Sequence, residues 1–259
     1  MIDILGYSAL VDEAETSGRQ EEVFGSLYEA LLKGRNGLEG KTSGLPKLPK
    51  YGPKDSYVLK AFTDNIAIAW PIRSDAEVEL GQALTKLMHF QFSMSLRGFF
   101  IRGAIAIGNA YVDDIAVFGS ALTEAYLGES KLARDPRIIL TQSSVAATKR
   151  HLKYYGNPLH SPQASDLLKD SDGQWFLNYL EAVMIAANER GPFYEEFVQH
   201  KSVVETKLRQ YANDPAIFAK YAWVANYHNY FCELYANDFS EEHKIDTRLF
   251  TPKPSPIVT

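Results

Sequence analysis

The first eight residues constrain the fold most, because an apolar run there carries one acidic residue and then stops at a glycine. A short apolar run ended by glycine predicts a buried strand followed by a tight turn. We expect the turn at Gly6, with a helix capped by Ser8 behind it. Burying an ionised carboxylate is costly unless a partner or a cation compensates it, so Asp3 in this run is a candidate functional residue.

A second stretch, residues 57–70, predicts two strands joined in a hairpin with Asp64 at its tip. Two carboxylates carried by apolar strands suit Mg²⁺, which is usually held by one or two carboxylates together with substrate phosphates. Two-metal sites of this kind stabilise the attacking and leaving oxygens of an in-line displacement. Asp64 followed by Asn65 would also suit an ordinary hairpin turn, so it is the pair of acids that favours a metal site.

Length, charge and cysteine content exclude several classes of protein. A chain of 259 residues can form one large domain, or one domain with an extension, and Met1 lies so close to Asp3 that either the first strand is very short or the natural start lies upstream. The net charge of −5 and the lack of a Lys/Arg run argue against a nucleic-acid partner. The single cysteine, Cys232, forms no intrachain disulfide, which fits the cytoplasm. With no signal peptide or long apolar segment, no direct membrane contact is expected.

Strand and helix patterns alternate along the first 140 residues. After the first strand they predict a helix, two strands, a helix that begins at the capping box of residues 74–77, and further strands around a helix. This order predicts an α+β fold, a ferredoxin-like βαββαβ sandwich. We expect a domain over residues 1–182 and a C-terminal helical extension over residues 183–259, packed on it. The predicted helices cover residues 19–33, 74–96, 119–133, 142–151, 193–211 and 215–235. The predicted strands cover residues 56–62, 66–70, 99–107, 136–140 and 174–180, and residues 110–118 are predicted as a strand or a hairpin that turns at residues 113–114.

Four short motifs follow one another in this first part of the chain. They are Asp-Ile-Leu-Gly-Tyr-Ser at residues 3–8, Lys-Ala-Phe-Thr-Asp at 60–64, Ile-Arg-Gly-Ala-Ile-Ala-Ile-Gly at 101–108, and Phe-Gly-Ser-Ala-Leu at 118–122. Each alone is weak, but in this order they resemble the class III nucleotidyl cyclases. The particular residues in these motifs look most like those of the pyrimidine cyclases of bacterial anti-phage (Pycsar) systems. The resemblance implies the cyclase palm, with residues 1–182 as the catalytic domain.

The resemblance also implies roles for the matching residues. Asp3 and Asp64 would bind two Mg²⁺ or Mn²⁺ ions, with the Ile4 carbonyl as a third oxygen ligand. The turn of residues 5–8, at a helix N-terminus, would hold the triphosphate through backbone amides. The ribose 3′-hydroxyl of UTP or CTP would attack the α-phosphorus and release pyrophosphate, which yields a cyclic monophosphate as a second messenger in anti-phage defence. The substrate-binding turn consists of Leu5, Gly6, Tyr7 and Ser8.

Some positions depart from the family pattern. The helix after Gly119 should carry an Asn and, one turn later, an Arg that stabilises the transition state, but these positions hold Thr123 and Leu127. The Asp that reads adenine in purine cyclases falls at Ala116, although Lys60 is present. These departures favour either a pyrimidine substrate or loss of turnover.

Arg102 interrupts an otherwise apolar strand and therefore needs a charged partner. It is our candidate catalytic cation, and a structural ion pair with Glu124 or Glu129 is the alternative. Both acids are expected on a helix surface or at an interface. Tyr57 and Lys60 are candidates for base binding, because an aromatic side chain would fill the volume that a pyrimidine leaves empty. The other residues considered for these roles are Tyr51, Lys131, Arg134 and Arg137.

Class III sites are built from two subunits, so the resemblance implies a homodimer with composite sites. A nucleoside triphosphate would be the substrate, and a separate effector protein would read the product. Two other functions stay open, namely a degenerate nucleotide-binding sensor that keeps the two acids without turnover, and a purine (ATP or GTP) cyclase. A dinucleotide synthase is disfavoured because the sequence lacks a Gly-Gly-Asp/Glu-Glu-Phe signature.

Overall fold

The structure is a computed structural model that describes residues 1–38, 58–62, 64–112, 116–184 and 194–250. The chain divides into two compact units, Met1–Ala182 (unit 1) and Val183–Thr259 (unit 2), and each is described by itself. None of the helices in the described ranges is both long and apolar enough to span a lipid bilayer.

Seven strands of unit 1 form one mixed sheet in the order β2-β3-β1-β4-β7-β9-β8. Neighbouring strands are antiparallel, except that β4 and β7 run parallel. The three-residue β1 lies between the β2–β3 hairpin and β4, and its apolar side chains are buried. This sheet and its helices confirm the predicted α+β class. The strands are β1 (Ile2–Ile4), β2 (Val58–Phe62), β3 (Asn65–Ala69), β4 (Ile101–Ile105), β7 (Ile138–Leu140), β8 (Leu167–Lys169) and β9 (Trp175–Leu177).

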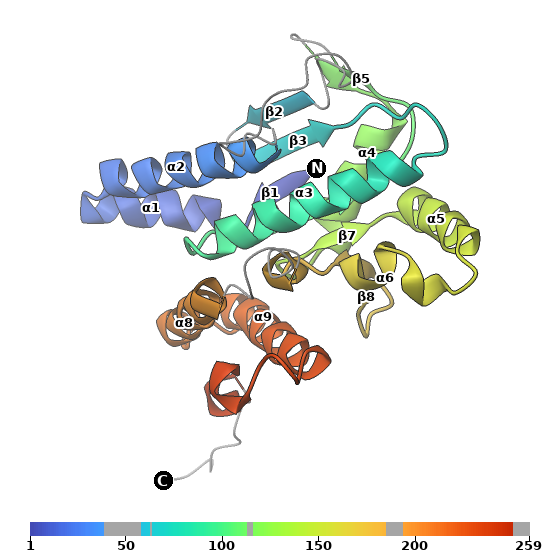
Figure 1. The fold of residues 1–259 in the computed structure, drawn as a ribbon. Helices are drawn as coiled ribbons and strands as arrows, with labels where there is room; N and C mark the ends of the chain where they lie inside the picture. The colour runs from blue at the N-terminus through green and yellow to red at the C-terminus, as the bar shows by residue number, and fades with distance from the viewer. Residues whose placement is uncertain (39–57, 63, 113–115, 185–193, 251–259) are drawn as a thin grey trace, which may run out of the picture. The chain divides into compact units, whose positions relative to one another are not determined.

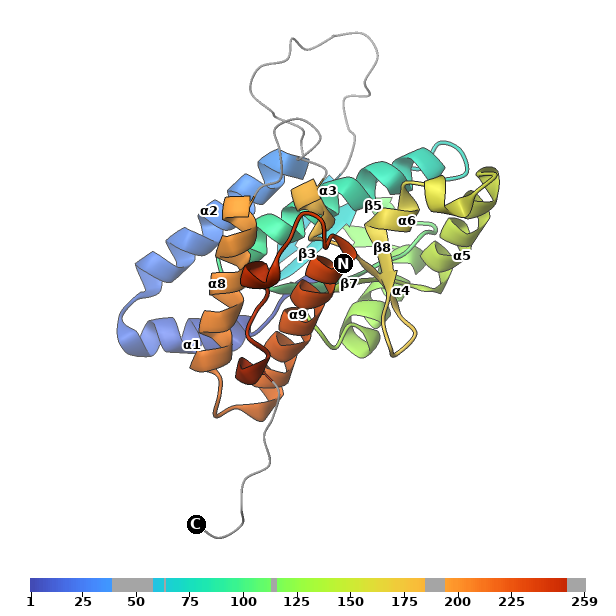
Figure 2. The ribbon, with the colours of Figure 1, turned by 60° about the horizontal axis from the view of Figure 1, so that its bottom comes forward.

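Three helices pack together beside the sheet, as Figure 1 shows and Figure 2 confirms from another direction. They are α1 (Tyr7–Ser17), α2 (Gln20–Leu38) and α3 (Glu77–Ser95), and α2 packs along α3. The apolar stripe of α3 is buried, and Gln91 Nε2 in that helix donates to the Pro136 carbonyl at 3.2 Å. The helix is thereby tied to the sheet just ahead of β7. Fully or almost fully buried side chains of the stripe are Leu80, Ala83, Leu84, Leu87 and Met88.

The parallel connection from β4 to β7 runs through a helix that changes its winding. It starts as α4 (Ser120–Leu127) and continues as one π-helical turn, η1 (Gly128–Leu132), which packs on β4 and β7. Gly128 is required there, because a Cβ on it would lie 2.7 Å from Ala104 Cβ and 2.9 Å from Thr141 Cγ2. The remaining described elements of unit 1 are β5 (Tyr111–Val112), β6 (Val117–Phe118), α5 (Gln142–His151), α6 (Gln163–Asp166), η2 (Leu152–Tyr154) and η3 (Pro158–His160).

Two predicted helix starts are wrong. The first helix begins directly after Gly6, whose φ of 73° lies in the left-handed region, so Ser8 is inside the helix and does not cap it. Helix α3 begins at Glu77 and not at Ser74, because Ala76 at φ 74° interrupts the helical backbone. The Asp75 carboxylate, rather than the Ser74 hydroxyl, accepts the amide of Glu77 at 3.2 Å.

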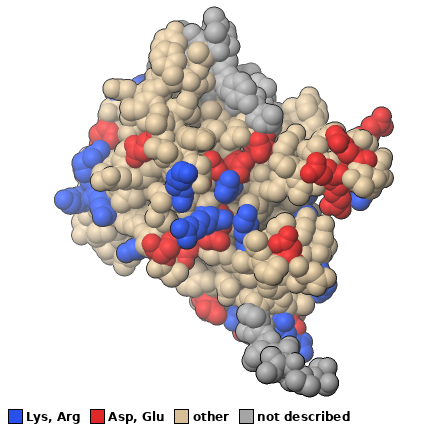
Figure 3. Space-filling view, turned by 180° about the vertical axis from the view of Figure 1, so that it is seen from behind, with Lys and Arg blue, Asp and Glu red and all other residues tan. Residues whose placement is uncertain are grey.

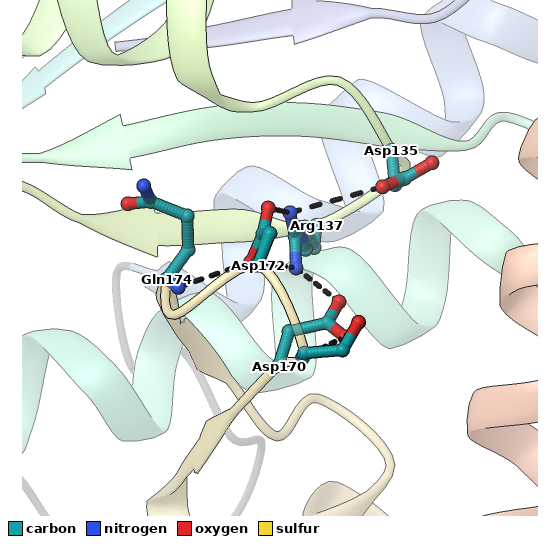
Figure 4. Close-up of polar contacts among 6 residues, drawn as sticks. Asp135, Arg137, Asp170, Asp172 and Gln174 are labelled. Atoms are coloured by element: carbon teal, nitrogen blue, oxygen red, sulfur yellow. Dashed lines mark hydrogen bonds and ion pairs between the residues drawn. The ribbon is translucent and has the colours of Figure 1, made fainter.

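A buried arginine joins β7 to the β8–β9 hairpin. The side chain of Arg137 is only 1 % exposed, and it forms ion pairs with Asp170 and Asp172 in the hairpin turn and with Asp135 at 3.7 Å (Figure 4). Its guanidinium carbon also lies 5.8 Å from the centroid of the Phe176 ring. Arg137 therefore stabilises this edge of the sheet, and its charge is already used there rather than in a substrate site.

An apolar cavity of about 150 Å³ opens beside the start of β1. Met1 and Ile2 form part of its wall, and the rest comes from β3, α3, β4 with the residues after it, and α4. Small side chains dominate this lining, among them Ala67, Ala69, Ala83, Ala104, Ala106, Ala121 and Ala125.

The face of the molecule in Figure 3 carries Lys and Arg side chains close to Asp and Glu side chains. Charges of both signs thus lie near one another on this face.

Unit 2 is built on two helices, α8 (Tyr194–Gln210) and α9 (Pro215–Leu234), which lie side by side in Figures 1 and 2. Asp214 caps α9, since its carboxylate accepts the amides of Ala216 and Ile217 at 3.1 and 3.0 Å. The segment after α9 contains two short 3₁₀ turns, η4 (Glu241–His243) and η5 (Thr247–Leu249).

Candidate active site

Strand β1 places Asp3 between two neighbouring strands. Asp3 pairs with Asn65 of β3 on one side and with Arg102 of β4 on the other. Side chains alternate along a strand, so Asp3 points to the opposite face from Ile2 and Ile4. It is only 8 % exposed. The sequence therefore folds an acid into the centre of the sheet, as its apolar flanks predicted.

Asp64 lies next to Asp3 although the two are far apart in the sequence. It immediately precedes β3, and its backbone carbonyl accepts the amide of Ile4 at 3.2 Å. Asn65 Nδ2 donates to Asp64 Oδ1 at 3.0 Å. The carboxyl groups of Asp3 and Asp64 are also within hydrogen-bonding reach of each other. The structure thus brings together the two acids that the sequence singled out.

Arg102 joins Asp3 to a third acid. Its Nε donates to Asp3 Oδ2 at 2.8 Å, and its Nη2 lies 3.0 Å from Oε1 of Glu129. The Glu129 side chain is only 4 % exposed, so the expectation that it lies on a helix surface is wrong. Of the two acids suggested as partners for Arg102, Glu129 is one, whereas Glu124 accepts the amide of Ser143 at 3.0 Å.

Negative charge is in excess at this cluster, and the pKa values reflect it. Burial raises the pKa of the Asp3 carboxyl, Arg102 opposes that shift, and the nearby Asp64 adds to it. The pKa of Glu129 is also raised by burial, again opposed by Arg102 and increased by Asp3 and Asp64. Arg102 pairs with Asp3 and Glu129, the Met1 amino group also acts on Glu129, and Asp64 adds a third carboxyl group, an arrangement that a further cation would stabilise.

The turn from β1 into α1 lies next to these acids. The Leu5 amide donates to the Phe100 carbonyl at 2.9 Å, so it is used by the sheet. The first amides of a helix have no partner within the helix, and in α1 they follow Gly6, starting with those of Tyr7 and Ser8. A helix start with no acidic side chain in its first turn suits an anionic ligand. Of the four residues predicted to bind the triphosphate, Tyr7 and Ser8 can therefore offer helix-start amides.

Other predicted site residues are exposed, have contacts of their own, or lie outside the described residues. Tyr57 and Tyr51 are outside, and so is the side chain of Lys60, whose backbone pairs with Ala67 in the β2–β3 hairpin. Thr123 donates its hydroxyl to the Gly119 carbonyl at 3.3 Å, and the Leu127 side chain is exposed. Lys131, within the π-helical turn, and Arg134, just after it, are exposed.

Two carboxyl groups side by side repel each other once both are ionised, and a divalent cation relieves that repulsion. Within the described ranges, no three side chains of His, Cys, Asp or Glu are grouped so as to hold a metal ion by themselves. The remaining ligands at Asp3 and Asp64 would have to be backbone carbonyls such as Ile4, water and substrate phosphates. That mixture is usual for Mg²⁺, so the donor set fits Mg²⁺ or Mn²⁺.

Sequence reasoning named Glu129 as a possible partner of Arg102 but did not place it at the site of Asp3 and Asp64. A signal was present, because Gly128 precedes it inside a predicted helix, and a glycine there often has a packing reason.

No protein-family model matches the chain, and neither the curated proteins nor the solved structures contain a match.

Proposed function

We propose that this protein is a pyrimidine nucleotidyl cyclase, which converts UTP (or CTP) to its 3′,5′-cyclic monophosphate and pyrophosphate. One observation carries the proposal, namely that Asp3 and Asp64 lie side by side next to the N-terminus of α1. The strand order β2-β3-β1-β4 supports it, since that is the order of a ferredoxin-like βαββαβ palm. The four motifs resembling class III cyclases all fall on this part of unit 1.

The residues of the site take complementary roles. Asp3, Asp64 and the Ile4 carbonyl hold the divalent ions, and the amides at the start of α1 bind the triphosphate. Bound divalent ions supply the charge that lowers the pKa of the ribose 3′-hydroxyl and stabilises the leaving pyrophosphate. The 3′-oxygen forms a bond to the α-phosphorus as the bond from that phosphorus to the bridging oxygen breaks, and the hydroxyl proton passes to water.

Arg102 is the cation best placed to assist. It lies beside Asp3 in the sheet, and its side chain keeps partial exposure, so it can reach phosphate oxygens at the edge of the site. Tyr57 and Lys60 remain the residues proposed to bind the base. As in the family that the motifs resemble, two copies of the chain would form composite sites, and the cytoplasmic product would act on a separate effector in anti-phage defence.

A second candidate function is a nucleotide-binding sensor without turnover. It is favoured by the positions that should supply transition-state groups, because Thr123 uses its hydroxyl within α4 and Leu127 carries no polar group. In that case Asp3 and Asp64 would bind metal and nucleotide, and no product would form.

A product assay separates these functions. Purified protein is incubated with UTP, CTP, ATP and GTP in separate reactions with Mn²⁺ or Mg²⁺, and products are resolved by mass. We expect a cyclic monophosphate from UTP or CTP alone. Asp64→Ala should abolish it, whereas Asp12→Ala, an exposed acid on α1, should leave it unchanged.

Other outcomes would redirect the assignment. A product from ATP or GTP would make the protein a purine cyclase and would point to Lys60 in base recognition. Metal-dependent nucleotide binding without any product would favour the sensor. Turnover that survives Asp64→Ala would rule out the proposed metal site.

A further inference from the structure

Glu129 is a buried acid whose carboxylate faces Arg102. It lies at the second position of η1, and Gly128 before it is wedged against Ala104 and Thr141, which fixes the position of its backbone. Although Arg102 Nη2 is only 3.0 Å from Glu129 Oε1, that buried oxygen has no well-aligned hydrogen-bond donor among the described residues. Glu129 thus has acceptor capacity that is not used in this arrangement.

Arg102 occupies one oxygen of the carboxylate that a metal ion would bind. Its Nε donates to Asp3 Oδ2 at 2.8 Å, and this carboxylate is also one of the two that would hold the divalent cation. A guanidinium and a divalent cation on the same carboxylate repel each other. Binding of the cation is therefore opposed for as long as Arg102 stays against Asp3.

We propose that Arg102 and the divalent cation compete for Asp3, and that Glu129 is the positioning residue that retains Arg102 once the cation has bound. The inference rests on the proposed metal site at Asp3 and Asp64. Held by Glu129, the guanidinium stays beside the site, where the phosphates of the substrate arrive. In the metal-free protein the same side chain neutralises part of the charge of the acids.

The competition gives two substitutions opposite effects on metal affinity. Arg102→Met removes the competing charge, so Mn²⁺ should bind about tenfold more tightly, a change within the range of close charge–charge interactions. Glu129→Gln leaves Asp3 as the main charged partner of Arg102, so Mn²⁺ should bind about tenfold more weakly. Lost negative charge alone would also weaken binding in Glu129→Gln, and a double variant distinguishes the two causes.

The double variant Arg102→Met/Glu129→Gln lacks the arginine, so Glu129 can no longer influence Mn²⁺ binding through it. The weakening caused by Glu129→Gln should therefore be smaller in the Arg102→Met background than in the wild type, which is a measurable coupling. Two matched controls carry the same changes elsewhere in unit 1. They are Arg97→Met, whose surface partner is Glu29 at 3.4 Å, and Glu124→Gln, whose side chain accepts the Ser143 amide.

The experiment is a calorimetric Mn²⁺ titration of the full chain without nucleotide, with folding checked by circular dichroism. Tighter binding in Arg102→Met, weaker binding in Glu129→Gln and a reduced effect in the double variant support the inference. If Arg102→Met does not fold, Arg102→Lys gives the same direction, because an ammonium cannot bridge Asp3 and Glu129 as a guanidinium does.

Two results would overturn it in distinguishable ways. If Asp64→Asn abolishes Mn²⁺ binding and Arg102→Met leaves the Mn²⁺ affinity unchanged, Arg102 does not compete with the cation. The proposed function would then still stand. Mn²⁺ binding in neither the wild type nor Arg102→Met would overturn the metal site itself, and with it both proposals. Mn²⁺ binding that is detectable in Arg102→Met and not in the wild type would be the strongest support for the competition.

Discussion

The Nδ1 atoms of His200 and His228 lie 3.0 Å apart between α8 and α9, with both rings fully buried and stacked. His228 Nε2 lies 2.9 Å from the His243 carbonyl oxygen, which can only accept, so the proton of His228 is on Nε2. His200 must then donate from Nδ1 to Nδ1 of His228. The hydrogen bond needs one unprotonated Nδ1, so the two rings cannot both be charged, which makes the pair a source of acid sensitivity in unit 2.

We expect unit 2 to lose stability as the pH falls below about 6.5, the ordinary pKa of histidine. Burial lowers the pKa of His228 to about 4 and that of His200 well below its usual value, so the unfolded chain binds protons that the folded chain does not. The contribution is complete above pH 6.5 and is lost on acidification toward pH 4; for His228 it amounts to about 3 kcal/mol. Urea unfolding followed by tryptophan fluorescence at several pH values measures it.

His200→Asn is the matched variant, because an amide Nδ2 can donate in place of the imidazole Nδ1 while it does not titrate. Its free energy of unfolding should fall less steeply between pH 6.5 and pH 5 than that of the wild type. Equal slopes in the two proteins would show that the pair does not control the acid response.

A buried acid pair in unit 1 should respond to pH in the opposite direction. Burial, reinforced by the charge of Glu181, raises the pKa of Asp166 from 3.8 to about 7. The folded chain therefore holds a proton that the unfolded chain releases, and stability is lost as the pH rises from about 4 to 7, by up to about 4 kcal/mol. Asp166→Asn should raise the free energy of unfolding at pH 8 and change it little at pH 4.

The control for Asp166→Asn is Glu13→Gln, an exposed acid on α1, which should shift the free energy of unfolding by less than about 0.5 kcal/mol at either pH. A stability difference for Asp166→Asn that does not change with pH would contradict the assignment of a raised pKa.

Removing the charge of Arg137 should strongly destabilise unit 1. Arg137→Met leaves Asp170 and Asp172 without their shared cation, and loss of one partner of a buried ion pair costs about 3–5 kcal/mol. The free energy of unfolding of Arg137→Lys should lie between those of the wild type and Arg137→Met, since an ammonium cannot pair with both acids in the fork geometry of a guanidinium. Arg209→Met breaks an exposed pair with Glu205 at 3.2 Å and should cost under about 1 kcal/mol by the same urea titration.

Adding a methyl group at Gly128 should displace the π-helical turn. In Gly128→Ala the new Cβ meets Ala104 and Thr141 inside normal contact distance, which costs about 1–3 kcal/mol and moves Glu129 away from Arg102. Thr141→Ser removes the clashing Cγ2 and keeps the hydroxyl that donates to the Ile105 carbonyl at 3.0 Å, so it should recover part of the loss. Thermal unfolding of the single and double variants measures this.

Gly81→Ala on α3 is the control for a glycine with open space around it. There alanine should raise stability by up to about 1 kcal/mol, because it favours the helix more than glycine does. A Gly128→Ala protein as stable as the wild type would mean that η1 can shift without loss of packing.

The sequence predicted those parts of the fold that depend on local pattern. The apolar run around Asp3 and the hairpin at Asp64 are each visible within ten residues, and the order of strands then brings the two acids together. The three-residue β8 was missed, because it is too short to show alternation and is defined by its pairing with β9. No local signal could reveal the partnership of His200 with His228, since it depends on how α8 packs on α9.

Glu129 shows a different reason for failure. A period of 3.6 residues assigns it to the surface of a helix, but the helix widens to a π turn at Gly128 and rotates the following side chains. The change of winding results from close contact with Ala104 and Thr141, which belong to other elements. Long-range packing therefore decided the one site residue that the helical pattern misplaced.

The alanine-lined cavity beside β1 leaves unit 1 room for larger side chains. It is a partly open hollow of about 150 Å³ with a mostly apolar lining. Filling such a hollow with larger apolar side chains is a common route to higher stability. The strand that carries Asp3 thus borders a place where unit 1 can gain buried apolar area with no change to the acids themselves.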